Sequence, residues 1–341
     1  MQTRDASPPT IEDVARAADV STATVSRVLN TPQAVRDVLR RRVVDAVAAL
    51  GYVPHAGARA LKLQRSGTVG AIFPTIDNAI FAKAIEALQQ RLAQGGRQLL
   101  IATCGYDLET ERRQAVNLVT RGADALALCG VGQSPALLKF LRQRELPVVH
   151  AMVWPPPPGT LCIGYDNARA IGQAVRYLVD LGHRRIAMLA GLVRDNDRAA
   201  ARVEGVRRAL LDAGLPLPPA RIVQRRYGLA EAREGFRVLM AARPAPTAVL
   251  CGNDVLAIGA LLEAQTLGLA VPATVSIVGF DDLEMARHLQ PALTTLHVPT
   301  EALWCAVADA LTAGIEQQTP RSQELEVGLV VRGSTGPAPR R

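Results

Sequence analysis

The pattern that most constrains this fold is an alternation of short apolar runs with longer amphipathic segments, which begins near residue 69. The apolar runs have the length of strands and contain no Asp, Glu, Lys or Arg; they are 69–73, 99–103, 125–129, 148–153, 186–190, 248–252, 275–280 and 294–298. Near-continuous apolar strands separated by helices are typical of a parallel sheet with helices on both faces. Residues 66–334 are therefore predicted to be an α/β domain.

This many strands can close into one barrel or form two doubly wound lobes. A proline run at 155–158, in the middle of the segment, favours two lobes. In two such lobes the carboxyl ends of the strands and the first turns of the helices face a shared cleft, where small polar ligands usually bind. The polar residues 335–341 are predicted to be a disordered tail.

The first part of the chain follows a different pattern, with short helical segments and no strand signal. Residues 1–9 are predicted to be a flexible arm, and residues 10–54 to hold three helices. Thr10 and Asp13 have the spacing of a capping box, and Ser21 can cap a second helix that ends near Leu29. The third helix runs from about residue 36 to Leu50, and Gly51 ends it.

The second of these helices has the residue types of a helix that reads DNA. One face carries small and hydroxyl side chains, followed by an arginine: Ser21, Thr22, Ala23, Thr24, Ser26 and Arg27. Hydroxyls bond phosphates, alanine can touch a thymine methyl, and arginine can reach guanine or phosphate. Two helices joined by a tight turn can place such a helix in the major groove. The alternative is a capped surface helix of a small all-α subdomain.

Charge supports a polyanionic partner. The formal net charge is +8, from 39 Lys and Arg against 31 Asp and Glu. Ten basic and six acidic residues fall within residues 1–65, which gives that segment 10 − 6 = +4. Basic charge is therefore concentrated at the N-terminus, which suits a polyanionic partner without proving one.

Other classes of protein find little support. The five cysteines are far apart and predict buried free thiols, and the five histidines show no ligand spacing, so neither a metal nor a cofactor is expected. No apolar run has the length of a membrane span or a signal peptide, which predicts a cytoplasmic protein with no membrane partner. Nucleophile-elbow, phosphate-loop and dinucleotide-binding motifs are absent, so an enzyme with a DNA-binding appendage remains only a remote alternative. An architectural DNA-binding protein would not need so large a cleft domain.

The segment IEDVARAADVSTATVSRVLN, residues 11–30, closely resembles the DNA-binding signature of the lactose/galactose-repressor family. The resemblance continues along almost the whole chain, through 51–54, 58–62, 164–172, 181–187, 251–260, 275–282 and 291–299. It implies a helix-turn-helix domain followed by a two-lobed domain like that of periplasmic binding proteins. It also implies a transcription repressor that binds a pseudo-palindromic operator as a homodimer, under the control of a small-molecule effector.

The resemblance further implies roles for individual residues toward DNA. Thr22, Ala23 and Arg27 would stand where bases are read, and Ser21, Thr24 and Ser26 where phosphates are held. Asn30 is a further DNA-binding candidate. Residues 55–65 resemble the hinge that relatives order as a helix on operator DNA, with Ala58 allowing close approach, Leu61 as a wedge in the minor groove and Lys62 beside it. The alternative for Leu61 is an ordinary linker contact.

In the two-lobed domain, the family motifs place Arg202, Asn253 and Asp281 where a ligand's hydroxyls or carboxylates are held. Phe81, Arg194 and Tyr227 match wall positions of the ligand site. Asp281 could instead serve as a cap or ion pair, and Arg194 could be solvated. His183 is expected to be structural.

The class of effector is predicted from a missing acid. Many sugar-binding relatives carry an Asp at the end of the fourth strand, whereas residues 148–153 here read VVHAMV. A ligand site that lacks this Asp and keeps Arg202 favours a carboxylate ligand, since arginine binds carboxylates through paired charge-assisted bonds. Residues 76–82 and 104–111 also resemble those of gluconate-utilisation repressors. We therefore predict gluconate or a ketogluconate, which releases operator DNA, with a neutral sugar or a purine as the alternative.

Overall fold

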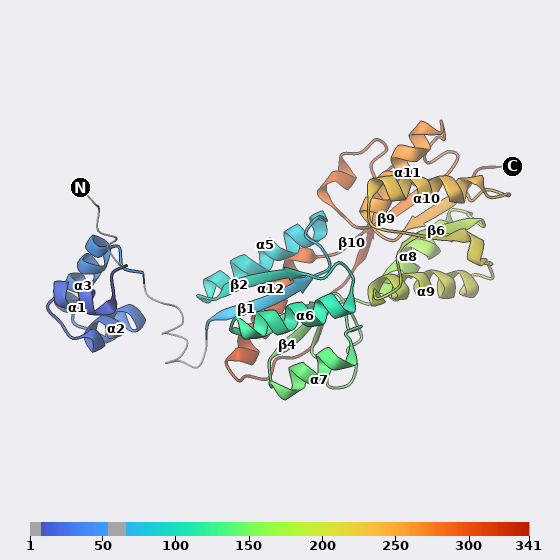
Figure 1. The fold of residues 1–341 in the computed structure, drawn as a ribbon. Coiled ribbons are helices and arrows are strands. Elements are labelled where there is room, and N and C mark those ends of the chain that lie inside the picture. The colour runs from blue at the N-terminus through green and yellow to red at the C-terminus, as the bar shows by residue number, and fades with distance from the viewer. Residues whose placement is uncertain (1–7, 54–65, 341) are drawn as a thin grey trace, which may run out of the picture. The chain divides into compact units, whose positions relative to one another are not determined.

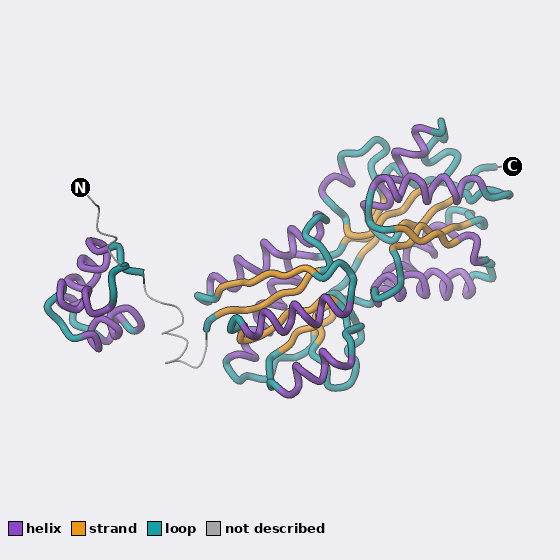
Figure 2. Tube along the Cα trace, in the orientation of Figure 1, coloured by secondary structure: helices purple, strands orange, loops and turns teal. Residues whose placement is uncertain are grey.

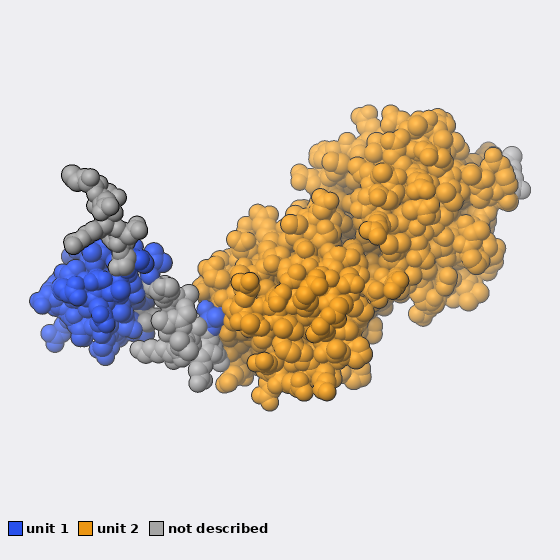
Figure 3. All heavy atoms as spheres, viewed as in Figure 1, with its two compact units in different colours: residues 1–66 blue, residues 67–341 orange. Residues whose placement is uncertain are grey.

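The computed structural model describes residues 8–53 and 66–340, and the chain divides into two compact units, residues 1–66 and 67–341 (Figure 3). The predicted hinge, with Ala58, Leu61 and Lys62, lies outside the described residues, as does most of the predicted arm. Each unit is described by itself below.

The first unit is built from three α-helices and a short 3-10 helix: α1 (Ile11–Ala17), α2 (Thr22–Asn30), η1 (Pro32–Ala34) and α3 (Asp37–Leu50). The capping box at Thr10 and Asp13 is present, and Ser21 Oγ accepts from the backbone N–H of Thr24 at 3.2 Å. Gly51 ends α3 in the left-handed conformation with φ 62°. The local sequence signals for these helices are therefore confirmed.

The second unit contains two six-stranded sheets, one in each lobe. The first sheet has the order β11-β5-β4-β3-β1-β2 and the second β12-β10-β9-β8-β6-β7. Neighbouring strands are parallel except for β10 and β12, which are antiparallel. The strands are β1 (Thr68–Phe73), β2 (Gln98–Thr103), β3 (Ala123–Cys129), β4 (Val148–Ala151), β5 (Cys162–Gly164), β6 (Ile186–Gly191), β7 (Ile222–Arg225), β8 (Ala248–Cys251), β9 (Ser276–Asp281), β10 (Thr294–His297), β11 (Gln323–Glu324) and β12 (Gly328–Val330).

Helices cover both faces of each sheet (Figures 1 and 2). In the first lobe α5 and α12 pack on one face and α6 and α7 on the other; in the second, α8 and α9 lie opposite α10 and α11. The helices are α5 (Ala79–Gln94), α6 (Leu108–Thr120), α7 (Pro135–Gln143), α8 (Asn167–Asp180), α9 (Asp197–Asp212), α10 (Leu229–Ala241), α11 (Asp254–Thr266) and α12 (Thr300–Ile315), with the 3-10 turns η2 (Pro219–Arg221) and η3 (Glu284–Arg287). Helices on both faces explain why the strands are apolar on both sides.

The prediction of two lobes is confirmed, but the proline run is not their boundary. Residues 155–158 lie between β4 and β5, inside the first lobe. The chain changes lobe after β5, after β10 and again between β11 and β12. Three separate crossings join the lobes, and none of them coincides with the proline-rich segment.

The tail predicted to be disordered from residue 335 is instead held by hydrogen bonds at Thr335, Gly336 and Ala338, so that prediction is wrong for these residues. Thr335 Oγ1 lies 2.9 Å from Thr294 Oγ1 and 3.0 Å from the hydroxyl of Tyr177. The Gly336 carbonyl accepts from Nε2 of His183 at 3.0 Å. His183 is fully buried and its ring needs polar partners on both nitrogens, which the tail and Thr247 supply. The structural role expected of His183 is confirmed.

Four strands were not predicted: β5, β7, β11 and β12. They have two to four residues each, and β2, β7, β11 and β12 form the sheet edges. Such short strands carry too few residues for a periodic pattern. Within the described part of the chain, every helix is too short or too polar to cross a membrane.

Candidate functional site

Helix α2 presents the predicted DNA-reading residues on its accessible face. Ser21, Thr22, Ala23 and Arg27 are exposed, while Thr24 and Ser26 are half-buried. The opposite face carries Val25 and Val28, which are buried against Val14 of α1 and Val43 of α3. The spacing of the valines thus holds the helix in place and turns the small hydroxyl side chains outward.

Arg27 is the exposed cation of this face. Its guanidinium makes no hydrogen bond or ion pair with any residue that the structure describes. Arg16, Arg40 and Arg42 of the same unit instead pair with neighbouring carboxylates. All the donors of Arg27 are therefore available to a partner molecule.

In the second unit, a cavity lies between the lobes, and five of the six predicted ligand residues line it. Its lining residues are Asn78, Ile80, Phe81, Tyr106, Met152, Asn196, Arg198, Arg202, Tyr227, Asn253 and Asp281. They come from the carboxyl ends of strands and the first turns of helices, as the parallel topology requires. Three of them, Asn78, Asn196 and Asn253, are N-caps of α5, α9 and α11.

Arg202 lines this cavity, but its guanidinium nitrogens donate hydrogen bonds to other residues of the protein. Its Nε donates to Asn167 Oδ1 at 2.9 Å, Nη1 to the Gly252 carbonyl at 2.5 Å and Nη2 to the Tyr165 hydroxyl at 3.3 Å. The guanidinium carbon lies 3.6 Å from the centroid of the Phe280 ring. Because each guanidinium nitrogen already donates to the protein, Arg202 contributes positive charge to the cavity and supports its wall, and it has few donors left for a ligand.

Asp281 and Asn253 face the cavity with unused polar atoms. Asp281 ends β9 and is 5% exposed, and its carboxyl makes no hydrogen bond or ion pair with a described residue. The cap or ion pair considered for Asp281 is therefore not found among the residues described. Asn253 accepts from Leu256 N through Oδ1, which leaves its amide group for a ligand.

Burial raises the pKa of Asp281 to about 8, an effect that Arg202 opposes and Asp254 adds to. Burial also raises the pKa of Asp254 to about 7, although Thr295 and Leu283 donate to its carboxyl. Both groups therefore keep a proton near neutral pH that an exposed carboxyl would have lost.

These two groups predict that folding stability falls as the pH rises. The unfolded chain releases both protons near pH 4 and the folded chain only near pH 7 to 8, so the unfolded state binds fewer protons across this window. We expect a lower urea midpoint at pH 8.5 than at pH 5.5. Asp281→Asn should remove about 3 kcal/mol of the stability difference between the two pH values, because the folded-state pKa of about 8 lies roughly 2.5 units above pH 5.5 and one unit corresponds to about 1.4 kcal/mol.

The matched control is Asp212→Asn, at an exposed position that ends α9. That variant should keep the wild-type dependence on pH. An unchanged dependence in Asp281→Asn as well would contradict the raised pKa of Asp281.

Arg194 was predicted as a wall residue, and the structure places it elsewhere. It lies in the loop between β6 and α9, and its side chain is 94% exposed, 3.6 Å from the Asp195 carboxylate. It lines no described cavity of this domain. The loop turns the side chain toward solvent, which agrees with the alternative of a solvated arginine.

Sequence reasoning missed Arg198, the second arginine of the cavity. It lies four residues before Arg202, and residues at this spacing share one face of a helix. The four-residue spacing from Arg202 could therefore have identified Arg198 as a candidate from the sequence. Asn78, Asn196 and Tyr106 were also missed; the two asparagines stand at helix starts that follow strands, a position that signals a cap.

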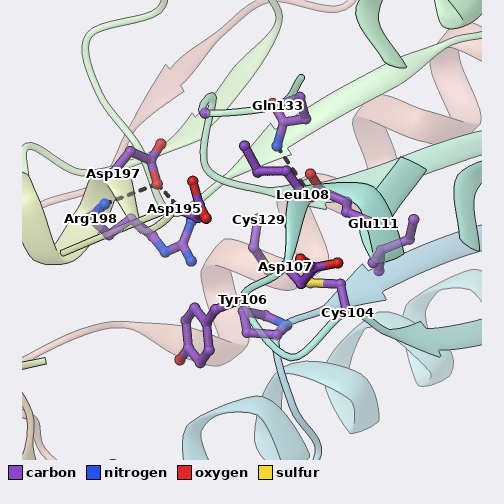
Figure 4. Close-up of a pocket in the computed structure, with 13 residues that line it drawn as sticks. Cys104, Tyr106, Asp107, Leu108, Glu111, Cys129, Gln133, Asp195, Asp197 and Arg198 are labelled. Atoms are coloured by element: carbon purple, nitrogen blue, oxygen red, sulfur yellow. Dashed lines mark hydrogen bonds and ion pairs between the residues drawn. The ribbon is translucent and has the colours of Figure 1, made fainter. Parts of the chain in front are cut away.

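A second cavity shares Tyr106 and Arg198 with the first. It is lined by Ile72, Pro74, Cys104, Tyr106, Asp107, Leu108, Glu111, Cys129, Gly132, Gln133, Asp195, Asp197 and Arg198 (Figure 4). Arg198 Nη1 donates to Asp197 Oδ1 at 2.9 Å, and Asp197 Oδ2 accepts from the backbone N–H of Val131 at 2.6 Å. Because Val131 belongs to the first lobe and Asp197 to the second, this contact crosses the cleft.

Gly130 is required for that approach. It has φ +79°, and a Cβ placed on it would lie 2.2 Å from Arg198 Nη1 and 2.3 Å from Asp197 Oδ1. Both the left-handed backbone and the lack of room favour glycine.

Comparison with protein families gives two matches. The model of bacterial regulatory proteins of the lacI family matches residues 10–55, and that of the periplasmic binding protein-like domain matches residues 175–335. Among curated proteins, the HTH-type transcriptional repressor PurR of Escherichia coli O1:K1 / APEC is 34% identical over 340 residues, covering 97% of this chain and 98% of its own. A PurR of Salmonella paratyphi A is 34% identical over 337 residues, with the same shares covered.

Solved structures of transcription regulators are also similar to this chain. A lac repressor dimer bound to operator and the anti-inducer ONPF is 26% identical, with a TM-score of 0.86, and covers 97% of this chain and 100% of its own. The transcription regulator GntR from Chromobacterium violaceum is 30% identical, with a TM-score of 0.74, over 79% of this chain and 99% of its own.

Proposed function

The chain belongs to the lacI family of bacterial regulatory proteins, and from that premise we propose how its two units act together. It is a DNA-binding transcription repressor with an effector-binding domain, and not an enzyme. In our proposal it works in the cytoplasm as a homodimer on a pseudo-palindromic operator, and a ligand in the cleft of the second unit sets its affinity for that operator.

On DNA, helix α2 enters the major groove. Thr22, Ala23 and Arg27 read base edges, and the exposure of these three side chains supports this role. The hydroxyl residues Ser21, Thr24 and Ser26 hold phosphates. Asn30, whose side chain is not among those that the structure describes, is a further candidate for DNA contact. Leu61 acts as the minor-groove wedge of a hinge over residues 55–65, flanked by Ala58 and Lys62.

The effector is a sugar acid such as gluconate or a ketogluconate. The observation that carries this proposal is the charge of the cleft cavity, which is lined by two arginines and a single carboxyl. Burial raises the pKa of that carboxyl, Asp281, to about 8, which lowers its negative charge at neutral pH, while Arg202 supplies a positive charge and Arg198 one that is paired with Asp197. Met152 occupies the end of the fourth strand, where an acid would have repelled a carboxylate.

The remaining lining suits a ligand with many hydroxyls. Asn78, Asn196 and Asn253 offer amide groups, and protonated Asp281 can both donate and accept. A purine is the second candidate, because the rings of Tyr106 and Tyr227 lie 5.8 Å apart at the cavity and Phe81 lines it too. Flat ring faces stack on a purine as well as on a sugar.

The experiment is operator release by a defined ligand panel. The full chain first selects a palindromic site from random DNA, and its affinity for that site is then measured by fluorescence anisotropy. D-gluconate, 2-ketogluconate, D-glucose and guanine are added in turn at constant salt. We expect a sugar acid to weaken operator binding at least tenfold. A ligand that binds the DNA-free form more tightly lowers the affinity for the operator by the same coupling factor.

Calorimetry of the same ligands with the full chain separates binding from response. If glucose or guanine binds and neither sugar acid does, the proposed effector class is wrong. If a sugar acid binds but strengthens operator binding, the class stands and the proposed release is wrong.

A further inference from the structure

Two buried acceptor oxygens in the second cavity have no partner. Oε2 of Glu111 and Oε1 of Gln133 make no hydrogen bond, although their residues are 5% and 7% exposed. Both residues line the cavity beyond Arg198, from α6 and from the loop after β3 (Figure 4). An unpaired buried polar atom destabilises the folded state, so two neighbouring ones call for a partner.

The missing partner must be a hydrogen-bond donor. Gln133 Nε2 donates to Glu111 Oε1 at 3.4 Å and to the Gly130 carbonyl at 3.3 Å. Both of these are acceptors, so the amide orientation is determined and its oxygen is the free end. Glu111 Oε2 is likewise an acceptor when ionised. A group with at least two N–H or O–H donors can satisfy both atoms at once.

The charge of this cavity favours a cation. Four carboxyl residues line it, Asp107, Glu111, Asp195 and Asp197, against the single cation Arg198. Asp107 caps α6 and Asp197 already accepts from Arg198 and Val131, which leaves Glu111 as the buried carboxyl with an uncommitted oxygen. Burial raises the pKa of Glu111, and a bound cation would offset the cost of its charge.

We propose that this cavity is a second binding subsite, which takes a primary ammonium group held by Glu111 and Gln133. The ammonium supplies three N–H donors and a positive charge, and it is small enough to lie beside Arg198 and Asp197. It comes either from a separate small amine or from an amino substituent on the ligand of the cleft cavity. The proposal rests on the proposed function only for the second of these sources.

The test uses the full chain and methylammonium chloride, against sodium chloride at equal ionic strength. Differential scanning fluorimetry of the wild type should show a saturable rise in Tm with methylammonium, because a ligand that binds only the folded state stabilises it. Glu111→Gln keeps the size of the side chain and removes its charge, and it should abolish the rise. Glu109→Gln is the matched control, since Glu109 is two residues away on α6 and pairs at the surface with Arg112. It should leave the rise unchanged.

A second arm identifies the source of the amine. D-gluconate and D-glucosaminate, which differ by one amino group, are compared by calorimetry. Tighter binding of glucosaminate by at least tenfold, lost in Glu111→Gln, assigns the subsite to the cleft ligand. A methylammonium response with no preference for glucosaminate assigns it to a separate amine.

The subsite is refuted if neither amine binds better to the wild type than to Glu111→Gln, the outcome expected if a buried water satisfies both oxygens. This result is separable from the proposed function. Gluconate binding without any amine effect leaves the effector proposal standing, and methylammonium binding without gluconate binding leaves the subsite standing.

Discussion

Replacing Arg27 with alanine abolishes specific operator binding while the fold of the first unit stays intact. The side chain is exposed and makes no hydrogen bond or ion pair with a described residue, so its removal breaks no contact that holds the helix. The core of the unit depends instead on Val14, Val25, Val28 and Val43. An arginine that reads a base is worth about 1–3 kcal/mol, and a dimer loses this twice, about 2–6 kcal/mol.

The measurement is fluorescence anisotropy on the selected palindromic site and on random DNA, at one salt concentration. Specific binding should fall to the level of random DNA. Arg207→Ala, on the exposed face of α9 in the other unit, loses the same charge and serves as the control. Unchanged operator affinity in Arg27→Ala at matched salt would remove Arg27 from the recognition surface.

On the proposed function, we expect Arg198→Gln to weaken the binding of gluconate 10- to 100-fold and to prevent operator release. Arg198 is 8% exposed and lines the cleft cavity. Of its guanidinium nitrogens, Nη1 donates to Asp197, and the other two form no hydrogen bond with a described residue. The remaining donors are available to the carboxylate of the proposed ligand. Hydrogen bonds to a charged group contribute about 1.5–3 kcal/mol, which corresponds to this range of affinity.

The fold should tolerate this change, because Asp197 keeps its bonds to the backbone N–H groups of Val131 and Arg198. Calorimetry of gluconate with the full chain measures the effect, and Arg208→Gln, exposed on the same helix, is the control. Arg202 is the informative contrast. Its three protein partners predict that Arg202→Gln lowers Tm, whereas Arg198→Gln lowers ligand affinity at nearly unchanged Tm. Equal gluconate affinity in Arg198→Gln and the wild type would contradict the role of Arg198.

Much of the fold was predictable because its signals are local. The capping residues Thr10 and Ser21 act within three residues of themselves, and a buried parallel strand reveals itself by four to six consecutive apolar residues. The edge strands β7, β11 and β12 lack such a run, since they are stabilised by a neighbour far away in the sequence. For the same reason the packed tail was missed, because the partners of Thr335 and Gly336 lie more than 100 residues earlier or on another strand.

Three capped N-terminal helices and an α/β domain with two lobes followed from the sequence, because periodicity and caps are properties of neighbouring residues. The residues that line the cavity were named by the resemblance to the lactose/galactose-repressor family. Only the tertiary structure decided the role of each arginine. Arg194, Arg198 and Arg202 lie within nine residues of one another, yet one is solvated, one faces both cavities and one is held by Asn167, Gly252 and Tyr165. Those surroundings come from both lobes and from segments distant in the chain, so charge and spacing could not distinguish the three side chains.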